Sequence, residues 1–140
     1  MAMPVPDRIH GAVRNALIKD GWTITADPFT VTYEEITVFA DLAAERTLAA
    51  EREGRRIVVE VKSFVGRSPI RDFEQALGQY ALYLGLLEMT EPDRELFLAV
   101  SDETYGELFQ QKAVQFLVRR FRVAILVVNV ETEQVVQWTA

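Results

Sequence analysis

The sequence predicts an α/β protein in which a mixed central β-sheet is flanked by helices. Helix-like and strand-like segments alternate along the chain, and most of the strand-like runs are rich in β-branched residues. The chain has 140 residues, enough to bury roughly two thirds of its unfolded surface around one core. We therefore expect a single domain over residues 1–140, with residues 1–6 as a flexible tail.

The N-terminal half is expected to contain one helix and three strands. In chain order these elements span residues 7–20, 22–25, 36–49 and 55–62. Asp7 is a suitable N-cap for the helix, and Gly21 ends it. The charged segment around Gly54 suits an exposed turn, so we expect the last two strands to form an antiparallel hairpin.

The C-terminal half is expected to alternate helices with buried strands. The predicted elements are a helix over 70–89, a strand over 95–101, a helix over 102–119 and strands over 123–128 and 135–138. The last strand is expected at an edge of the sheet. The helix over 102–119 has an apolar side made of Tyr105, Leu108, Phe109, Ala113, Phe116 and Leu117.

The most informative motif is the pair Glu60 and Lys62 inside an otherwise apolar, β-branched strand. Side chains alternate faces along a strand, so Val58, Glu60 and Lys62 share one face. The two charged residues then lie about 7 Å apart, by two strand rises. A charge in a core strand is costly unless it is paired or binds a metal, which indicates a functional site. The alternative is an ion pair on an exposed face.

A second carboxylate is expected from the strand before the hairpin turn. Asp41 can stand beside Glu60 on the adjacent antiparallel strand, which would bring two carboxylates and Lys62 together. A simple register centred on Gly54 would instead bring Glu45 opposite Lys62, so Glu45 competes with Asp41 for this role. Oxygen ligands from one or two carboxylates suit a divalent cation such as Mg²⁺.

The helix after the motif adds polar side chains. Gln75, Gln79 and Tyr83 recur every four residues and therefore stack on one helix face. An amide both donates and accepts hydrogen bonds, so Gln79 is a candidate to orient a metal-bound water or to contact a phosphate oxygen. The alternative is an ordinary polar helix edge.

These motifs resemble a known superfamily and, more narrowly, a family within it. Asp41, the run Glu60-Val61-Lys62 and the run Gln79–Tyr83 resemble the successive motifs of the PD-(D/E)XK nucleases, although Ala40 replaces the proline of that name. Longer phrases resemble the XisH family, the fdxN element excision controlling factors of cyanobacteria. They are residues 16–25, 41–45, 59–64, 76–80 and 91–96.

The resemblance implies a restriction-endonuclease-like fold and a role in programmed DNA excision in nitrogen-fixing cells, the heterocysts. It also implies a Mg²⁺- or Mn²⁺-dependent endodeoxyribonuclease site, although many superfamily members have lost this activity. Asp41, Glu60 and the backbone carbonyl of Val61 would be the metal ligands. Lys62 would act on the attacking water, and Gln79 would support it. The implied partners are a small co-encoded protein of the XisI type and a site-specific recombinase.

Composition excludes several other classes of site. The chain has no cysteine and one histidine, His10. Disulfides, thiolate zinc sites and cysteine nucleophiles are therefore excluded, as are histidine-rich metal sites. No apolar span is long enough for a membrane helix, and the first residues lack the basic and apolar regions of a signal peptide. We expect a cytoplasmic protein without membrane contact.

The net charge of −6 argues against tight DNA binding by the chain alone, because such proteins usually carry a basic surface. Small arginine clusters are present at Arg52, Arg55 and Arg56, at Arg67 and Arg71, and at Arg119, Arg120 and Arg122. We expect weak DNA binding that requires a partner or a homodimer. The alternative function is a non-catalytic scaffold that regulates a site-specific recombinase.

Overall fold

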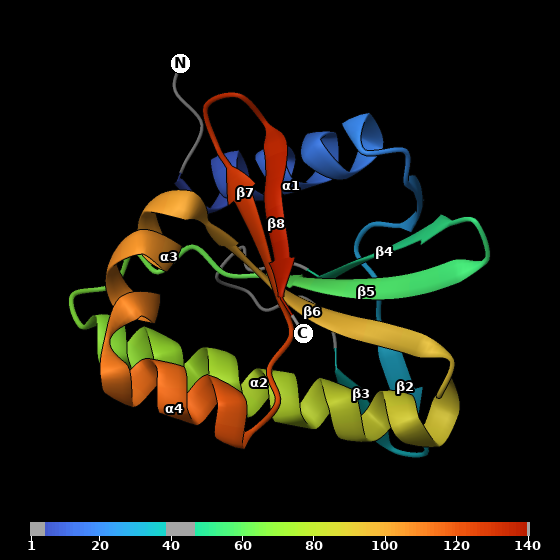
Figure 1. Ribbon diagram of the computed structural model, residues 1–140. Helices are drawn as coiled ribbons and strands as arrows, with labels where there is room; N and C mark the ends of the chain where they lie inside the picture. Colours follow the sequence, from blue (N-terminus) through green and yellow to red (C-terminus); the bar gives the residue numbers. More distant parts are fainter. Residues whose placement is uncertain (1–4, 39–46, 140) are drawn as a thin grey trace.

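The computed structural model describes residues 5–38 and 47–139, which form one six-stranded sheet, a separate two-stranded sheet and helices on both faces (Figure 1). The strands of the large sheet are, in spatial order, β1 (Thr23–Ala26), β4 (Thr47–Arg52), β5 (Arg55–Val61), β6 (Arg94–Ser101), β7 (Ile125–Asn129) and β8 (Gln134–Thr139). The central strands β5, β6 and β7 are parallel, and the outer pairings are antiparallel. The predicted mixed sheet between helices is confirmed, and so is the edge position of the last strand.

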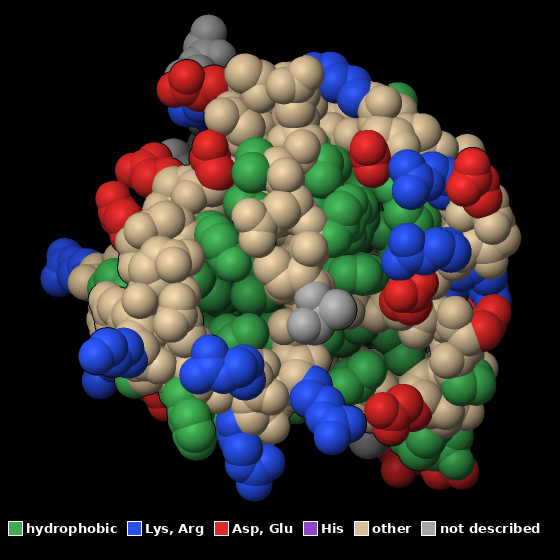
Figure 2. All heavy atoms as spheres, viewed as in Figure 1, with side chains coloured by type: hydrophobic (Ala, Val, Ile, Leu, Met, Phe, Trp, Pro, Cys, Tyr) green, Lys and Arg blue, Asp and Glu red, His purple; other side chains and the backbone are tan. Residues whose placement is uncertain are grey.

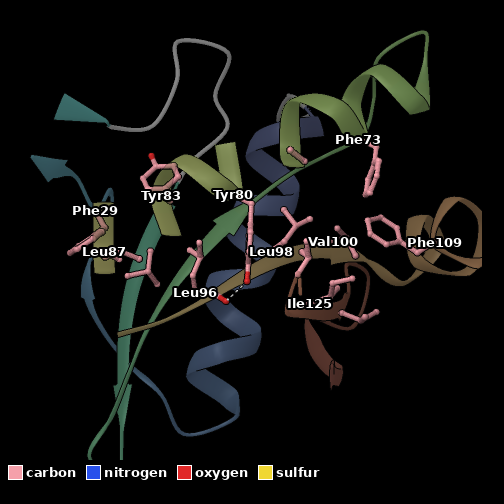
Figure 3. Packing of buried hydrophobic residues seen from close by; sticks show 14 of the residues in the cluster. Phe29, Phe73, Tyr80, Tyr83, Leu87, Leu96, Leu98, Val100, Phe109 and Ile125 are labelled. Carbon is pink, nitrogen blue, oxygen red and sulfur yellow. Dashed lines mark hydrogen bonds between the residues drawn. The ribbon is translucent and has the colours of Figure 1, made fainter. Parts of the chain in front are cut away.

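Two hydrophobic cores, one on each face of the sheet, hold the layers together. Helix α1 (Val5–Lys19) covers one face, where Ile57 and Val59 of β5 are buried. The other face, with Val58 of β5, lies under α2 (Pro69–Thr90) and three shorter segments. Those segments are α3 (Asp102–Glu107), the 3₁₀ helix η1 (Leu108–Gln110) and α4 (Lys112–Arg120). Figure 3 shows part of this core, with Phe73 and Tyr80 of α2 beside Leu98 of β6.

The first helix begins earlier than expected and ends as expected. Since α1 starts at Val5, Asp7 lies within the helix and is not its N-cap. Gly21 follows the helix with a φ of +92°, a left-handed conformation that glycine adopts at low cost. None of the helices in the described part of the chain combines the length and apolar character of a membrane span.

The β4–β5 hairpin is confirmed. Of the strand predicted over 36–49, residues 39–46 lie outside the described residues, and its two described ends belong to different sheets. The last part is in β4, whereas β3 (Ile36–Val38) pairs with β2 (Val31–Tyr33) in the separate sheet. The Glu34-Glu35 turn between β2 and β3 contains no Gly, Asn or Asp, so nothing in the local sequence marks it as a hairpin. In the β4–β5 turn, Glu53 and Gly54 both have positive φ, as a type I′ turn requires.

The single helix predicted over 102–119 is wrong, because the chain is extended at Gln111. The break resets the helical phase, so α4 presents a different set of residues to the core than an unbroken helix would. Val114 is fully buried in the structure, whereas Phe116 is 58% exposed. Ala113 is likewise exposed, while Leu108 and Phe109 are buried as predicted.

Candidate functional site

Buried polar side chains gather where β4 begins and β5 ends. Among the described residues, five polar or charged residues are buried, and four of them are Thr47, Glu60, Lys62 and Ser63. The fifth is His10, whose ring nitrogen Nε2 lies 2.9 Å from Asp27 Oδ2. β5 runs parallel to β6 and β7, and its last residue, Val61, is level with Ala99 of β6 and Leu126 of β7, before those two strands end.

Glu60 and Lys62 are only 4% and 6% exposed, so a surface ion pair does not describe them. Val58 is buried on the α2 side of the sheet. Since strand side chains alternate, Glu60 faces the same side, and Nζ of Lys62 donates to Oε1 of Gln75 on α2 at 3.4 Å. The predicted placement of the two charged residues on one face is confirmed.

The glutamine that contacts Lys62 is Gln75, one helical turn before the predicted Gln79. Gln79 is half-buried on α2 and makes no side-chain hydrogen bond with the described residues. The row continues to Tyr83, which is buried in the core. The spacing predicted that Gln75, Gln79 and Tyr83 share one helix face. Which of the three side chains reaches Lys62 depends on how α2 is rotated about its axis over the sheet. The supporting role of Gln79 stays a prediction.

The loop after Lys62 ties the end of β5 to the start of α2. The backbone N–H of Gly66 donates to Oδ2 of Asp72 at 2.8 Å. Ser68 caps the helix by accepting a hydrogen bond from the N–H of Arg71, and Pro69 is the first helical residue. These contacts fix the direction in which the chain leaves the site.

Asp41 and Glu45 lie outside the described residues, so their rivalry for the first ligand position stays open. In the described part of the hairpin, the residue opposite Glu60 is Thr47. The described residues contain no group of three or more His, Asp or Glu side chains placed to hold a metal ion. Glu60 supplies one carboxylate of the kind that Mg²⁺ accepts.

The charge of Glu60 acts on a neighbouring tyrosine. Burial is the main cause that raises the pKa of Tyr80, a hydrogen bond from the N–H of Ala124 lowers it, and the negative charge of Glu60 raises it further. The Glu60 carboxylate is therefore close enough to Tyr80 for its charge to add to the effect of burial.

Two of the predicted arginine clusters differ in whether their side chains pair with carboxylates. Arg52 pairs with Asp20, Arg55 with Glu95, and Arg56 with Glu51, Glu91 and Asp93. Within the described residues, Arg119, Arg120 and Arg122 form no ion pair. Arg119 and Arg120 occupy the last turn of α4, as predicted.

Comparisons with known proteins give a consistent result. The family model described as XisH protein matches residues 3–136. An XisH family protein from Nostoc punctiforme has a similar crystal structure, with 40% identity, a TM-score of 0.89 and coverage of 96% of this chain and 100% of that chain. An fdxN element excision controlling factor protein from Anabaena variabilis has 41% identity, a TM-score of 0.88 and coverage of 96% and 99%.

No curated protein matches the chain. The family match nevertheless spans nearly all of the sequence, and both similar crystal structures share its fold over almost their whole length. The chain belongs to the XisH family.

Proposed function

We propose that this chain controls the excision of a DNA element, as the description of its Anabaena relative indicates, and that it does so through a nuclease-like metal site. The observation that carries the proposal is the buried pair Glu60 and Lys62 on one face of β5, at the carboxyl end of that strand. A restriction-endonuclease-like fold of the PD-(D/E)XK type and a cytoplasmic place of action are parts of this proposal.

The residues have distinct roles in the proposed site. Glu60, the carbonyl of Val61 and either Asp41 or Glu45 would hold Mg²⁺ or Mn²⁺, which when bound would polarise a phosphate and lower the pKa of a water. Lys62 would position or deprotonate the attacking water, or offset the charge that develops on the phosphate. Gln75, which accepts a hydrogen bond from Lys62, would keep its ammonium in place.

A second candidate is a non-catalytic scaffold that regulates a site-specific recombinase together with a small co-encoded protein of the XisI type. The net charge of −6 favours this candidate. The pairing of Arg52, Arg55 and Arg56 with carboxylates favours it as well, because these cations are already neutralised.

The test is DNA cleavage with Mn²⁺ by the pure protein, alone and with its co-encoded partner, on supercoiled, linear and branched DNA. Lys62→Ala is expected to abolish cleavage and keep metal affinity, whereas Glu60→Ala is expected to lose both, because only the carboxylate is a ligand. Lys112→Ala removes an exposed lysine of α4 and serves as the matched control. Cleavage by Lys62→Ala at the rate of the unaltered protein would reject the nuclease assignment.

A further inference from the structure

A pocket of about 580 Å³ lies between the α3–α4 segment and the strands β7 and β8. Its polar and aromatic lining consists of Tyr105, Phe109, Gln115, Arg119, Arg122 and Thr139. Ile125 at the start of β7 also lines it and is level with Glu60 in the sheet, with Leu98 of β6 between them, whereas neither Glu60 nor Lys62 lines the pocket. It is therefore separate from the Glu60 and Lys62 site. The volume falls within the range of small-molecule sites, about 300–1,000 Å³.

The charge of this pocket is opposite to that of the chain. None of the described residues that line it is acidic, although the chain has a net charge of −6. Arg119 and Arg122 line it and have no carboxylate partner within the described residues. Figure 2 shows Lys and Arg side chains along the lower left of this face, beside the hydrophobic surface near the centre. Such a site attracts an anion.

Arg119 and Arg122 reach the pocket from the end of α4. Arg119 lies in the last turn of α4, where the helix dipole favours a cation. Arg122 follows the helix with a φ of 52°, the left-handed conformation in which many helices end, and the N–H of Val123 donates to the carbonyl of Val118 at 3.0 Å. This helix end places both arginines at the pocket.

An aromatic wall completes the pocket. The rings of Tyr105 and Phe109 are stacked, with centroids 6.0 Å apart and planes at 19°. Phe109 is buried, whereas Tyr105 is half-buried and is held by a hydrogen bond from Nε2 of Gln137 to its hydroxyl at 3.3 Å. A fixed, partly open aromatic ring beside two arginines suits a planar base attached to a phosphate.

We infer that this pocket binds one nucleotide unit, with the phosphate on Arg119 and Arg122 and the base against Tyr105. The unit is either a free mononucleotide or the phosphorylated end of a DNA strand, since both present the same chemistry. The inference does not depend on cleavage at Glu60 and Lys62.

Calorimetric titration of the full chain tests the inference with dAMP, inorganic phosphate, deoxyadenosine and a short single-stranded oligonucleotide with and without a 5′-phosphate. We expect dAMP to bind more tightly than phosphate or the nucleoside. Arg122→Gly should weaken dAMP binding about tenfold or more, because it removes a charge-assisted contact. Its thermal stability should not fall, since glycine suits the left-handed backbone. Arg120→Gln removes an arginine that does not line the pocket and should bind dAMP normally.

The two sources of the nucleotide give different results, and both support the inference. Tighter binding of the 5′-phosphorylated oligonucleotide than of dAMP identifies a strand end, and the reverse order identifies a free nucleotide. Three results would overturn the inference: no saturable binding of any nucleotide probe, equal affinity for dAMP and phosphate, or unchanged dAMP affinity in Arg122→Gly.

Discussion

At the scale of single residues, Lys62 depends on the loop that follows it. Phe64 in this loop has a φ of 53°, and its ring packs edge-on against Phe109 with centroids 5.6 Å apart. Gly66 brings the backbone against the carboxylate of Asp72. The chain is therefore held on both sides of the turn, and this restricts the positions that the buried ammonium of Lys62 can take.

Gly66→Ala is predicted to disturb this loop. A Cβ at this position would lie 2.7 Å from Oδ1 of Asp72, closer than van der Waals contact allows. We expect the free energy of unfolding to fall by about 0.5–1.5 kcal/mol, because the Asp72 side chain must turn away and give up the hydrogen bond from the N–H of Gly66, and chemical denaturation measures this change. Gly78→Ala is the control, because its Cβ would meet nothing within 4 Å in the interior of α2. Equal stability of the two variants would show that the contact with Asp72 is unimportant.

At the scale of elements, periodicity predicted the long segments well and the short ones poorly. The helix α2 and the strands β5 and β6 agree with the predicted segments within one residue. The β2–β3 hairpin and the break at Gln111 had no local signal, because sheet pairing and core packing decide both. In the site, strand alternation placed Glu60 and Lys62 correctly. The contact with Gln75 depends on how α2 lies across the sheet, which the sequence does not specify.

One tyrosine of α2 joins two strands at the point where their pairing begins. The hydroxyl of Tyr80 donates to the carbonyl of Leu96 at 3.0 Å (Figure 3). It accepts a hydrogen bond from the N–H of Ala124 at 3.1 Å. Leu96 precedes the first residue of β6 that pairs with β7, and Ala124 precedes β7 itself. The hydroxyl therefore gives hydrogen-bond partners to the carbonyl of Leu96 and the N–H of Ala124, which lie just before the paired residues of β6 and β7.

Tyr80→Phe is predicted to lower the free energy of unfolding by about 1–3 kcal/mol, because it leaves buried backbone groups without a partner. Tyr33→Phe is the matched control, since Tyr33 is 39% exposed. Urea denaturation at neutral pH measures both. A Tyr80→Phe variant as stable as the control would contradict the bridging role.

The same hydroxyl makes stability depend on alkaline pH. Burial raises the pKa of Tyr80 above its ordinary value of 10.0, so the folded chain keeps this proton at a pH where the unfolded chain releases it. The stabilisation is complete below about pH 10 and is lost as the pH rises through the pKa of the folded state. We expect the free energy of unfolding to fall above about pH 10, and to fall less steeply in Tyr80→Phe. Parallel pH profiles would contradict this.

At the scale of the whole molecule, negative charge prevails, with a net charge of −6. Within the described residues, Arg52, Arg55 and Arg56 are paired with carboxylates, whereas the exposed Arg67 and Arg71 are not. Apolar side chains that a partner could contact lie on α4 and on the edge strand β8. Trp138 of the edge strand packs on Phe97 and Trp22, with centroids 4.9 and 5.7 Å away, whereas Phe116 and Val136 are 58% and 51% exposed. Phe116 and Val136 are thus better candidates for a docking surface than Trp138.

We predict that the chain alone binds duplex DNA weakly and that a partner or self-association strengthens binding. The affinity should fall steeply with salt, because phosphate contacts release counterions. Light scattering after size-exclusion chromatography and DNA binding across a salt series measure this. A strictly monomeric protein that binds duplex DNA with sub-micromolar affinity in moderate salt would refute the prediction.

The central claim is that Glu60 belongs to a metal site completed by a carboxylate from the segment 39–46. Calorimetric titration with Mn²⁺ tests this claim without relying on a DNA substrate. We predict saturable binding that is lost in Glu60→Gln and in one of Asp41→Asn and Glu45→Gln, which would also identify the first ligand. The Lys62→Ala variant should still bind Mn²⁺. Binding that is absent from the unaltered chain, or that is unchanged in Glu60→Gln, would contradict the claim.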